Sequence, residues 1–462
     1  MDLITDVEIL SGYLTDASNT HGHAEALLRP KDAQEVSQIL TMASKYKIPV
    51  TVTAQRTSTT GGPVPYGGWL LSMERMSHIF SDTEVGGGCL LGEVQSRLEA
   101  KGLLFPPDPT SRNECSVGGA IACNASGARS FRYGSIRKWV EALEVVFPTG
   151  EIQILDRSVP IPSNFPQLSW KLPAVKTAAG YHPAENMLDL MIGQEGTLGV
   201  ITRAWLNIIP APVAVMGLIV WFSELEDAIG FVELAREGAQ RPDVSARSNS
   251  LNPRAIEFFD HQCLELIRKR VDIPEEAHCG LFIEIEHDGD PDLEPWLEAL
   301  ETSNALVEEI IAAETAEERE RLYSIRHAIP AGVNEIVIAN GMPKVGTDFS
   351  VPDSALREMM HHYEQVSLRN VLFGHIGDNH LHLNLFPQNE QELEQARQLY
   401  RDLALKAVAL GGSVSAEHGI GKIKTQLLSD MMGLEVVKTY QRIKKHLDPS
   451  GVLGQGNLFA LR

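Results

Sequence analysis

Hydrophobic and polar positions follow two different periods in the first half of the chain. Residues 32–46 repeat apolar side chains at helical spacing, and Asp32 precedes them as an N-cap candidate. The run at 48–53 is rich in β-branched residues and predicts a strand. Residues 142–155 predict a hairpin about a short turn that contains Gly150. This part therefore mixes helices and strands.

The second half repeats longer elements. The segment 208–213 carries two prolines in three positions and predicts a boundary between domains. After it, strands are predicted near 214–222, 279–287, 343–350 and 371–374, and helices near 224–238, 314–328, 353–366, 390–410 and 422–447. Alternating helices and strands of this kind predict an α+β domain whose helices lie on one face of its sheet.

Composition and charge narrow the function classes. A chain of 462 residues is longer than one ordinary domain, so two or three domains are expected. With 40 Lys and Arg against 61 Asp and Glu, the formal net charge is −21, which disfavours a nucleic-acid partner and an anionic membrane surface. No apolar run reaches the roughly eighteen residues of a transmembrane helix. The acidic N-terminus lacks the basic segment of a secretory signal.

Five scattered cysteines without C-x-x-C spacing indicate neither a disulfide framework nor a cysteine metal site. A reducing cytoplasm fits them best.

Glycine-rich loops indicate a phosphate-bearing cofactor. No G-x-G-x-x-G fingerprint follows a strand and no P-loop occurs, which disfavours a Rossmann NAD site and a nucleoside triphosphatase. Glycines cluster instead at 61–62, 86–88, 118–127 and 193–199. Each cluster alone is more often an ordinary turn. Four of them together favour a binding site for a large phosphate-bearing cofactor, because glycine lets backbone N–H groups approach phosphate closely.

A histidine-rich segment, His375-Ile-Gly-Asp-Asn-His-Leu-His-Leu-Asn384, is the strongest chemical signal. His380 and His382 share one face of a strand, and a tight turn returns His375 to the same place. Three histidines in eight residues favour a metal site over three satisfied structural histidines, although not all three need ligate. Glu417, from a separate segment, would add a carboxylate.

Three further residues are candidates for acid–base chemistry and anion binding. His418 follows Glu417 directly and is either a proton acceptor or another metal ligand. Arg326 and Lys344 have apolar neighbours, which favours the binding of a carboxylate over a solvated helix face.

Several segments of the sequence resemble those of a known family. The segments 106–109, 118–127 and 181–210 are similar to the vanillyl-alcohol-oxidase (PCMH) type of FAD-binding domain. The segment 375–384 and the Glu417-His418 pair are similar to the C-terminal domain of FAD-linked oxidases. Across nearly its full length, the chain resembles the FAD-linked D-2-hydroxyacid dehydrogenases, which include D-lactate dehydrogenases, D-2-hydroxyglutarate dehydrogenases and the flavin subunit of glycolate oxidase.

The resemblance implies a domain layout and an FAD site. We expect an FAD-binding domain over 1–210, a substrate or cap domain with an antiparallel sheet and a metal site over 211–420, and a helical segment over 421–462 that returns to the FAD domain. The implied FAD-binding residues are Arg56, Thr57, Ser58, Thr59, Thr60, Gly61, Pro107, Asp108, Gly118, Gly119, Asn124, Ser126, Gly127, Glu195, Gly196 and Ile201. The first phosphate loop reads Thr53-Ala-Gln-Arg-Thr-Ser58 where the family has R-G-G-G-T-G, and it offers no histidine for covalent attachment, so FAD is expected to bind non-covalently.

The resemblance also implies roles for the second set of residues. His375, His382 and Glu417 match the ligands of a divalent metal, zinc or manganese, and His418 matches the general base. Arg326, Lys344 and Asn384 match the positions that anchor the substrate. The chain departs from the family's G-D-G-N-L-H motif because His380 stands in place of the asparagine, as a candidate for the metal shell.

The implied reaction is oxidation of a D-2-hydroxyacid to the 2-oxoacid, with D-lactate as the first candidate and glycolate or D-2-hydroxyglutarate as alternatives. Electrons would pass from FAD to a quinone, a cytochrome, an electron-transferring flavoprotein or an iron–sulfur protein. We expect a cytoplasmic enzyme, either free or attached to the inner membrane through its acceptor, and a homodimer as the default assembly.

Three other function classes stay open. A non-redox flavin enzyme such as an alkyl-glycerone-phosphate synthase would reduce no dye with any hydroxyacid. A metal-dependent hydrolase would purify colourless. A pure binding module is disfavoured, because a clustered His/Glu/Arg/Lys pocket is costly to maintain without chemistry. A substrate with a second carboxylate would need a further base, for which Arg247 and Arg254 are the candidates.

Overall fold

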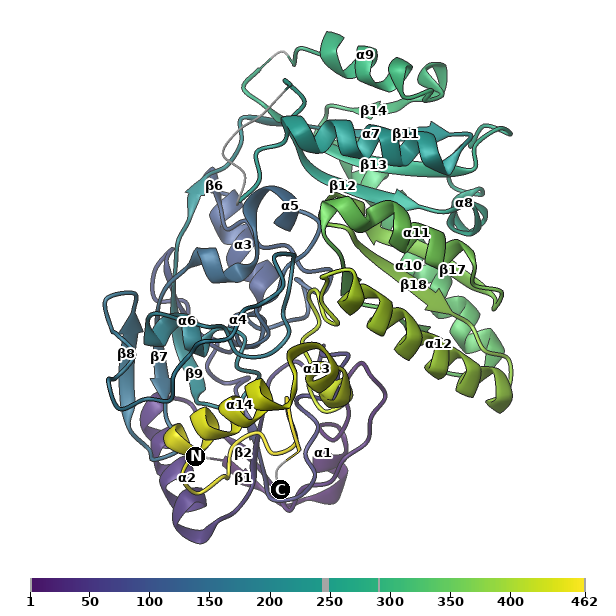
Figure 1. Cartoon of the computed structure of the whole chain (residues 1–462). Coiled ribbons are helices and arrows are strands. Elements are labelled where there is room, and N and C mark those ends of the chain that lie inside the picture. Colours follow the sequence, from purple (N-terminus) through teal and green to yellow (C-terminus); the bar gives the residue numbers. More distant parts are fainter. Residues whose placement is uncertain (1, 243–248, 290, 461–462) are drawn as a thin grey trace.

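The computed structural model describes residues 2–242, 249–289 and 291–460. Within these ranges, the N-terminal part of the chain forms two four-stranded sheets (Figure 1). The first sheet has the order β1 (Asp2–Ile4), β2 (Ala26–Arg29), β4 (Trp69–Ser72) and β3 (Val50–Thr53). Strand β4 runs parallel to both of its neighbours, whereas β1 is antiparallel to β2. The short helix α1 (Val7–Ser11) follows β1.

Helix α2 (Ala33–Tyr46) forms as the apolar spacing predicts. The side chain of Asp32 accepts a hydrogen bond of 2.9 Å from the backbone N–H of Glu35, which caps the first turn. The apolar face of the helix packs into one core with Leu71 and Val50 of the first sheet. The strand predicted at 48–53 forms as β3.

The second sheet is antiparallel throughout and has the order β5 (Glu84–Gly86), β9 (Val200–Leu206), β7 (Val140–Val146) and β8 (Ile152–Asp156). Strands β7 and β8 are the two arms of the predicted hairpin, which is confirmed. The elements that accompany this sheet are α3 (Leu91–Glu99), β6 (Leu103–Leu104), α4 (Val117–Ala122), α5 (Ser130–Tyr133), α6 (Met187–Met191) and β10 (Ile209–Pro210).

A larger antiparallel sheet follows residue 213. Over the described residues its strands have the order β14-β11-β13-β12-β17-β18-β15, and β16 also pairs with β18. Their bounds are β11 (Ala214–Phe222), β12 (Pro253–Phe259), β13 (Cys279–His287), β14 (Ile311–Ala313), β15 (Val345–Gly346), β16 (Phe349–Ser350), β17 (Asn370–His375) and β18 (His380–Leu385). Strands β11 and β13 occupy the predicted ranges.

Helices cover both faces of this sheet, so the expectation of helices on one face is wrong. Leu218 and Val220 of β11 share a core with α7 (Leu225–Gly238), α9 (Glu294–Thr302), α11 (Leu356–Glu364) and α12 (Glu390–Ala409). Ile219 and Trp221 of the same strand share another core with α8 (His261–Ile267) and α10 (Ala316–Asn340). Because both faces of β11 are buried, its sequence is an unbroken apolar run and not an alternation.

Element boundaries differ from the predictions at three places. Helix α10 continues through Pro330 to Asn340. The strand predicted at 343–350 is divided into β15 and β16. The helix predicted over 422–447 is two helices, α13 (Thr425–Met432) and α14 (Leu434–Leu447), separated by Gly433, whose φ of 80° interrupts the helical backbone.

The C-terminal segment, yellow in Figure 1, returns to the N-terminal part of the chain, where Val452 and Leu453 share a core with the first sheet. Val50 of β3 forms a parallel bridge with Leu453. Lys444 of α14 is buried and donates hydrogen bonds to the carbonyl oxygens of Thr197, at 2.8 Å, and Leu453, at 2.7 Å. The domain boundaries at 210 and 420 remain predictions.

Candidate active site

The β17–β18 hairpin brings the three predicted histidines together. Its register sets His375 opposite His380, and the turn between them closes through Asn379, which has a left-handed φ of 53°. Side chains alternate along a strand, so His380 and His382 project from one face of β18. The ring centroids of His375 and His380 are 5.3 Å apart, and those of His380 and His382 are 4.5 Å apart.

Glu417 reaches the histidines from a loop that Asp348 holds in place. The carboxylate of Asp348 is 1% exposed in its side chain and accepts hydrogen bonds from the backbone N–H groups of Glu417 and His418, both at 3.2 Å. It also accepts from the hydroxyl of Ser415 at 2.7 Å and pairs with Lys424 at 2.6 Å. The buried carboxylate of Asp348 therefore fixes the backbone of this loop.

The four side chains offer converging ligand atoms. One donor atom from each of His375, His380, His382 and Glu417 lies within 4.8 Å of the others. The Nε2 atoms of His375 and His382 are each 3.5 Å from an oxygen of Glu417, and Nδ1 of His380 is 3.9 Å away. The structure thus brings together residues from two segments that the sequence separates by more than thirty positions.

A buried lysine side chain influences the charge of this cluster. Lys176 is buried, with Nζ 3.3 Å from Glu417 and 3.6 Å from Asp378. Burial alone would raise the pKa of Glu417, but Lys176 and His375 hold that pKa well below its usual range. Glu417 is therefore ionised at neutral pH, as a metal ligand must be.

His418 lies beside the cluster with its two ring nitrogens in different surroundings. Its Nδ1 is 3.5 Å from Asp348 and its Nε2 is 3.6 Å from Glu417. The ring stacks on His382 with centroids 5.5 Å apart. Burial lowers the pKa of His418, although Asp348 and Glu417 oppose this, so the ring is neutral and able to accept a proton.

Arg326 lies behind the histidines. Its Nε and Nη2 donate to Glu257 at 3.1 and 2.8 Å, and the other oxygen of Glu257 lies 2.5 Å from Nδ1 of His375. Of the three guanidinium nitrogens, Nη1 is the one that this pair does not use.

Lys344 and Asn384 form a second polar pair, on β18 and the segment before β15. The Nζ of Lys344 donates to Oδ1 of Asn384 at 2.7 Å. Much of Lys344 is exposed, yet the protein around its ammonium group lowers the pKa of Lys344, and no anionic group offsets this burial among the described residues. An anionic substrate would therefore stabilise the charged form of this lysine.

The two arginines considered for a second carboxylate have different outcomes. Arg247 lies outside the described residues. Arg254 is buried and pairs with Glu284 at 2.6 Å and with Glu286 at 3.2 Å. Because both partners are carboxylates, they disfavour the binding of a substrate anion by Arg254, and that candidate role stays a prediction.

The predicted FAD-binding segments pack against one another with no room for larger side chains. A Cβ on Gly118 of α4 would lie 2.7 Å from the carbonyl oxygen of Gly87, and one on Gly127 would lie 2.1 Å from that of Asp108. The N–H of Glu195 donates to the carbonyl of Ala122 at 2.8 Å. Gly119, Asn124, Ser126, Gly196 and Ile201 lie in the same segments, and Pro107 precedes Asp108.

The loop 53–62 joins these segments through the C-terminal part of the chain. Asn457 donates to the carbonyl oxygens of Gly62, at 3.1 Å, and Glu195, at 2.8 Å. The carboxylate of Glu195 accepts from the N–H groups of Ile420 and Gly421, and burial raises the pKa of Glu195 to about 7. Arg56, Thr57, Ser58, Thr59, Thr60 and Gly61 all lie on this loop. The predicted cofactor segments thus lie next to the Glu417–His418 loop.

The residues present fit a bound flavin nucleotide. Asn124 Oδ1, Ser126 Oγ and Thr53 Oγ1 are buried atoms without a hydrogen-bond partner among the described residues. Such orphaned groups are rare and costly, and a polar ligand would satisfy them. Arg56 and Asn124 also have left-handed φ angles of 59° and 49°, which turn the backbone sharply at two of the predicted contacts.

The histidine cluster fits a divalent metal by its donor chemistry. Imidazole nitrogen and carboxylate oxygen are ligands for zinc and manganese. Nδ1 of His380 and Oε2 of Glu417 are buried without a hydrogen-bond partner in the described part of the chain, although Lys176 lies near the latter. His375, His382 and Glu417 would hold the ion.

Sequence reasoning missed four residues that support this site: Glu257, Asp348, Lys176 and Lys424. Glu257 carried one usable signal, since it is an acid between the apolar residues Ile256 and Phe258 in a segment able to form a strand. Asp348 lies in the predicted strand 343–350, but its neighbours are of mixed polarity. Lys176 lies in a loop and Lys424 lies at the start of α13, and at such positions a lysine gives no such signal.

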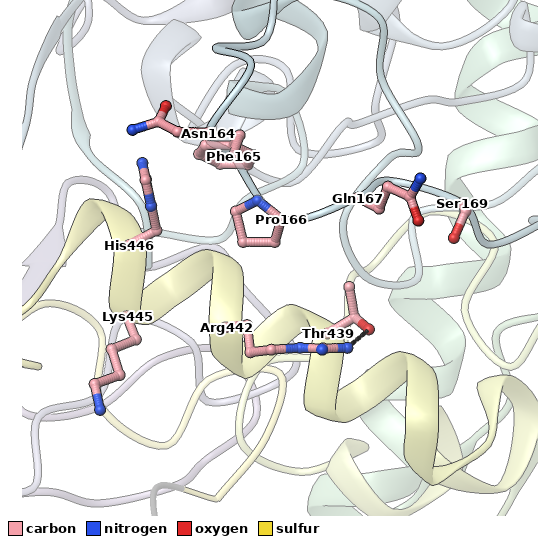
Figure 2. Close-up of a pocket in the computed structure, with 9 residues that line it drawn as sticks. All are labelled: Asn164, Phe165, Pro166, Gln167, Ser169, Thr439, Arg442, Lys445 and His446. Atoms are coloured by element: carbon pink, nitrogen blue, oxygen red, sulfur yellow. Dashed lines mark hydrogen bonds between the residues drawn. The ribbon is translucent and has the colours of Figure 1, made fainter.

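A separate surface cavity of about 520 Å³ lies between the loop 164–169 and helix α14 (Figure 2). Thr439, Arg442 and His446 of α14 line it, and Arg442 is hydrogen-bonded to Thr439 at 2.7 Å. It shares no residue with the histidine cluster or the predicted FAD segments. Its size therefore does not make it the candidate active site.

Among the described helices, none has the length and apolar character needed to span a membrane. The five cysteines all lie in the described ranges and are unpaired.

Comparisons with known proteins give the class. Residues 24–156 match the family described as "FAD binding domain", and residues 238–458 match "FAD linked oxidases, C-terminal domain". The solved structure of an alkyldihydroxyacetonephosphate synthase aligns with this chain at a TM-score of 0.68 and 16% sequence identity. The alignment covers 98% of this chain and 81% of the synthase chain, and at this identity it shows a shared fold and nothing about function. The chain is therefore a flavoprotein with a PCMH-type FAD-binding domain and an FAD-linked oxidase C-terminal domain, and the predicted α+β fold class is confirmed.

Full-length relatives give the family. A D-lactate dehydrogenase of Anaerostipes hadrus is 30% identical over 98% of this chain and 93% of its own length. The glycolate oxidase subunit GlcD of Bacillus subtilis is 28% identical over 94% and 89%. A mitochondrial D-2-hydroxyglutarate dehydrogenase of Rattus norvegicus is 30% identical over 98% and 81%. The chain belongs to the FAD-linked D-2-hydroxyacid dehydrogenase family, so the predicted resemblance is confirmed.

Proposed function

We propose that this protein oxidises a D-2-hydroxyacid, D-lactate first and glycolate or D-2-hydroxyglutarate as alternatives, to the 2-oxoacid. One observation carries the proposal: a cluster of three imidazoles and Glu417, with His418 beside it, lies next to the segments that match FAD-binding positions. The D-lactate, glycolate and D-2-hydroxyglutarate enzymes among the relatives support the same substrate class.

The chain's own residues would bind the substrate by its carboxylate. Lys344 offers an ammonium group that no described anion balances, and Asn384 orients it. Arg326 would add Nη1, while its pairing with Glu257 fixes the guanidinium plane. These contacts would place the substrate hydroxyl toward the cluster.

His418 would remove the hydroxyl proton. Since Nδ1 faces Asp348, the neutral ring carries its proton there and leaves Nε2 as the acceptor on the side of Glu417. Bound zinc or manganese on His375, His382 and Glu417 supplies Lewis acidity that lowers the pKa of a nearby hydroxyl. Non-covalently bound FAD supplies the acceptor for the hydride that leaves the substrate C2 carbon.

The proposed oxidation removes two electrons from the substrate and therefore needs a second acceptor besides bound FAD. The sequence lacks the dinucleotide fingerprint, so we keep a quinone, a cytochrome, an electron-transferring flavoprotein and an iron–sulfur protein as the candidate classes. A cytoplasmic protein, free or attached to the inner membrane through that acceptor, and a homodimer remain part of the proposal.

A panel of D- and L-2-hydroxyacids with an artificial dye acceptor tests the function. The yellow protein should reduce dye with at least one D-acid and not with its L-enantiomer. Prolonged chelation should remove most of the rate, and zinc or manganese should restore it. No dye reduction with any hydroxyacid would favour a non-redox flavin enzyme, and a colourless protein would favour a metal-dependent hydrolase.

A further inference from the structure

In two of the cluster histidines, the ring nitrogen that faces away from Glu417 contacts an oxygen atom, as is usual in metal-binding histidines. Nδ1 of His375 lies 2.5 Å from Glu257, and Nδ1 of His382 lies 3.0 Å from the carbonyl oxygen of Thr347. In both rings the other nitrogen, Nε2, is the one that faces Glu417. An oxygen that fixes the far nitrogen selects the tautomer and leaves the near nitrogen free to ligate.

His380 repeats this arrangement with its nitrogens exchanged. Its Nε2 lies 3.0 Å from Oδ1 of Asp348, outside the angles of a good hydrogen bond, and its Nδ1 faces Glu417 at 3.9 Å. The side chain is 0% exposed, the most buried of the cluster. A buried polar atom without a hydrogen-bond partner costs about 1–3 kcal/mol of stability. Nδ1 of His380 would carry this cost unless it binds a ligand.

The backbone of the hairpin approaches the cluster closely at Gly374. Gly374, next to His375, has a φ of 134°, a conformation that L side chains rarely adopt. A Cβ at that position would lie 3.0 Å from Cδ2 of His382 and 3.1 Å from the carbonyl oxygen of His380. A side chain at 374 would therefore press on the His382 ring and on the backbone of His380.

The charges around the cluster also suit a cation. Glu417 belongs to the cluster, Glu257 and Asp348 contact its histidines, and Asp378 lies 3.6 Å from Lys176. Three basic side chains pair with them, Lys176, Arg326 and Lys424. The four carboxylates named here outnumber the three basic side chains that pair with them, an arrangement that suits a cation.

We propose that His380 is a further metal ligand through Nδ1, so that three histidines and Glu417 hold the ion. This inference rests on the metal-dependent function proposed above and extends its ligand set. Four protein ligands are one more than the three that catalytic zinc sites usually have.

The ligand set can be tested without turnover. The FAD-loaded protein would be dialysed against zinc at graded concentrations, with metal counted by mass spectrometry, and the zinc-loaded protein examined by X-ray absorption. His380→Asn is the test variant, and His361→Asn, an exposed histidine on α11, is the matched control.

The wild type and the control should bind one zinc ion per chain, with three imidazoles in its shell. His380→Asn should keep its FAD, raise the zinc Kd at least tenfold and show two imidazoles. An unchanged Kd and shell in the variant would overturn the inference. Two imidazoles in the wild type would overturn it as well, even if the variant failed to fold.

Dye reduction by the wild type, measured separately, keeps the two proposals apart. If the wild type binds zinc and oxidises a hydroxyacid but has only two histidines in the zinc shell, only the proposed role of His380 is overturned. A wild type that binds no divalent ion overturns this inference and the metal in the proposed function together.

Discussion

Nδ1 of His375 lies 2.5 Å from Oε1 of Glu257, and Arg326 holds the other oxygen of that carboxylate at 2.8 Å. Burial would raise the pKa of Glu257, but Arg326 and His375 lower it to about 2, so the group is an anion at any working pH. The predicted ligand and the predicted substrate anchor are therefore joined by a carboxylate that the sequence did not single out.

Glu257→Gln should weaken metal binding about 10- to 100-fold, because the amide cannot fix the His375 tautomer as an anion does. Metal titration of the FAD-loaded protein measures this effect. Glu265→Gln, which changes an exposed carboxylate on α8, is the control. Equal metal affinity in both variants would show that Glu257 serves only to neutralise Arg326.

The ligand residues could be predicted because strand periodicity places His380 and His382 on one face and the short turn returns His375. Their supports could not. Glu257 is 118 positions away from His375 in sequence, and only the pairing of β12 with β17 brings the two together. Long-range strand order is not encoded in local spacing.

The burial of the C-terminal sheet shows the same limit. Strands such as β11 were located by their apolar runs, but an apolar run does not say whether one or both faces will be covered. The observed helices on both faces follow from tertiary packing of α8 and α10, which start far from β11 in the chain.

His418→Asn should lower kcat by about 10²- to 10⁴-fold, which is the usual worth of a positioned general base. FAD content and metal content should not change, because the proposed ligands and FAD contacts are left in place. Stopped-flow measurement of flavin bleaching isolates the reductive half-reaction. A variant that bleaches its flavin at the wild-type rate would contradict the role of His418 as base.

Asp348→Asn should lower both stability and kcat, since Asp348 pairs with Lys424 and holds the backbone of Glu417 and His418. Leaving Lys424 buried without its anion should cost about 3–5 kcal/mol of unfolding free energy. Lys424→Met in the same chain removes that charge and should recover much of the stability. If kcat recovers with stability, Asp348 is not needed to position His418.

Arg254→Met should destabilise the fold by about 3–5 kcal/mol, because it leaves the buried Glu284 with one cation fewer. Denaturant unfolding measures this loss. The KM values for mono- and dicarboxylic hydroxyacids should change by the same factor, since Arg254 already has two carboxylate partners. A selective rise in KM for the dicarboxylic substrate would show that this arginine binds the second carboxylate.

His182 should make the protein sensitive to mild acid. Burial, aided by Arg137, lowers the pKa of His182 from 6.5 to about 4. As the pH falls below 6.5, the unfolded chain takes up a proton that the folded chain excludes until about pH 4. Stability from this residue is therefore complete above pH 6.5 and falls steadily across that window.

Replacement of His182 by glutamine should reduce the fall in Tm between about pH 7 and about pH 5, because glutamine takes up no proton in either state. Differential scanning fluorimetry of the FAD-loaded protein at several pH values gives the measurement. His361→Gln, at an exposed position, should leave the fall unchanged. Identical Tm profiles for the wild type and both variants would mean that the folded protein protonates His182 as readily as the unfolded chain does.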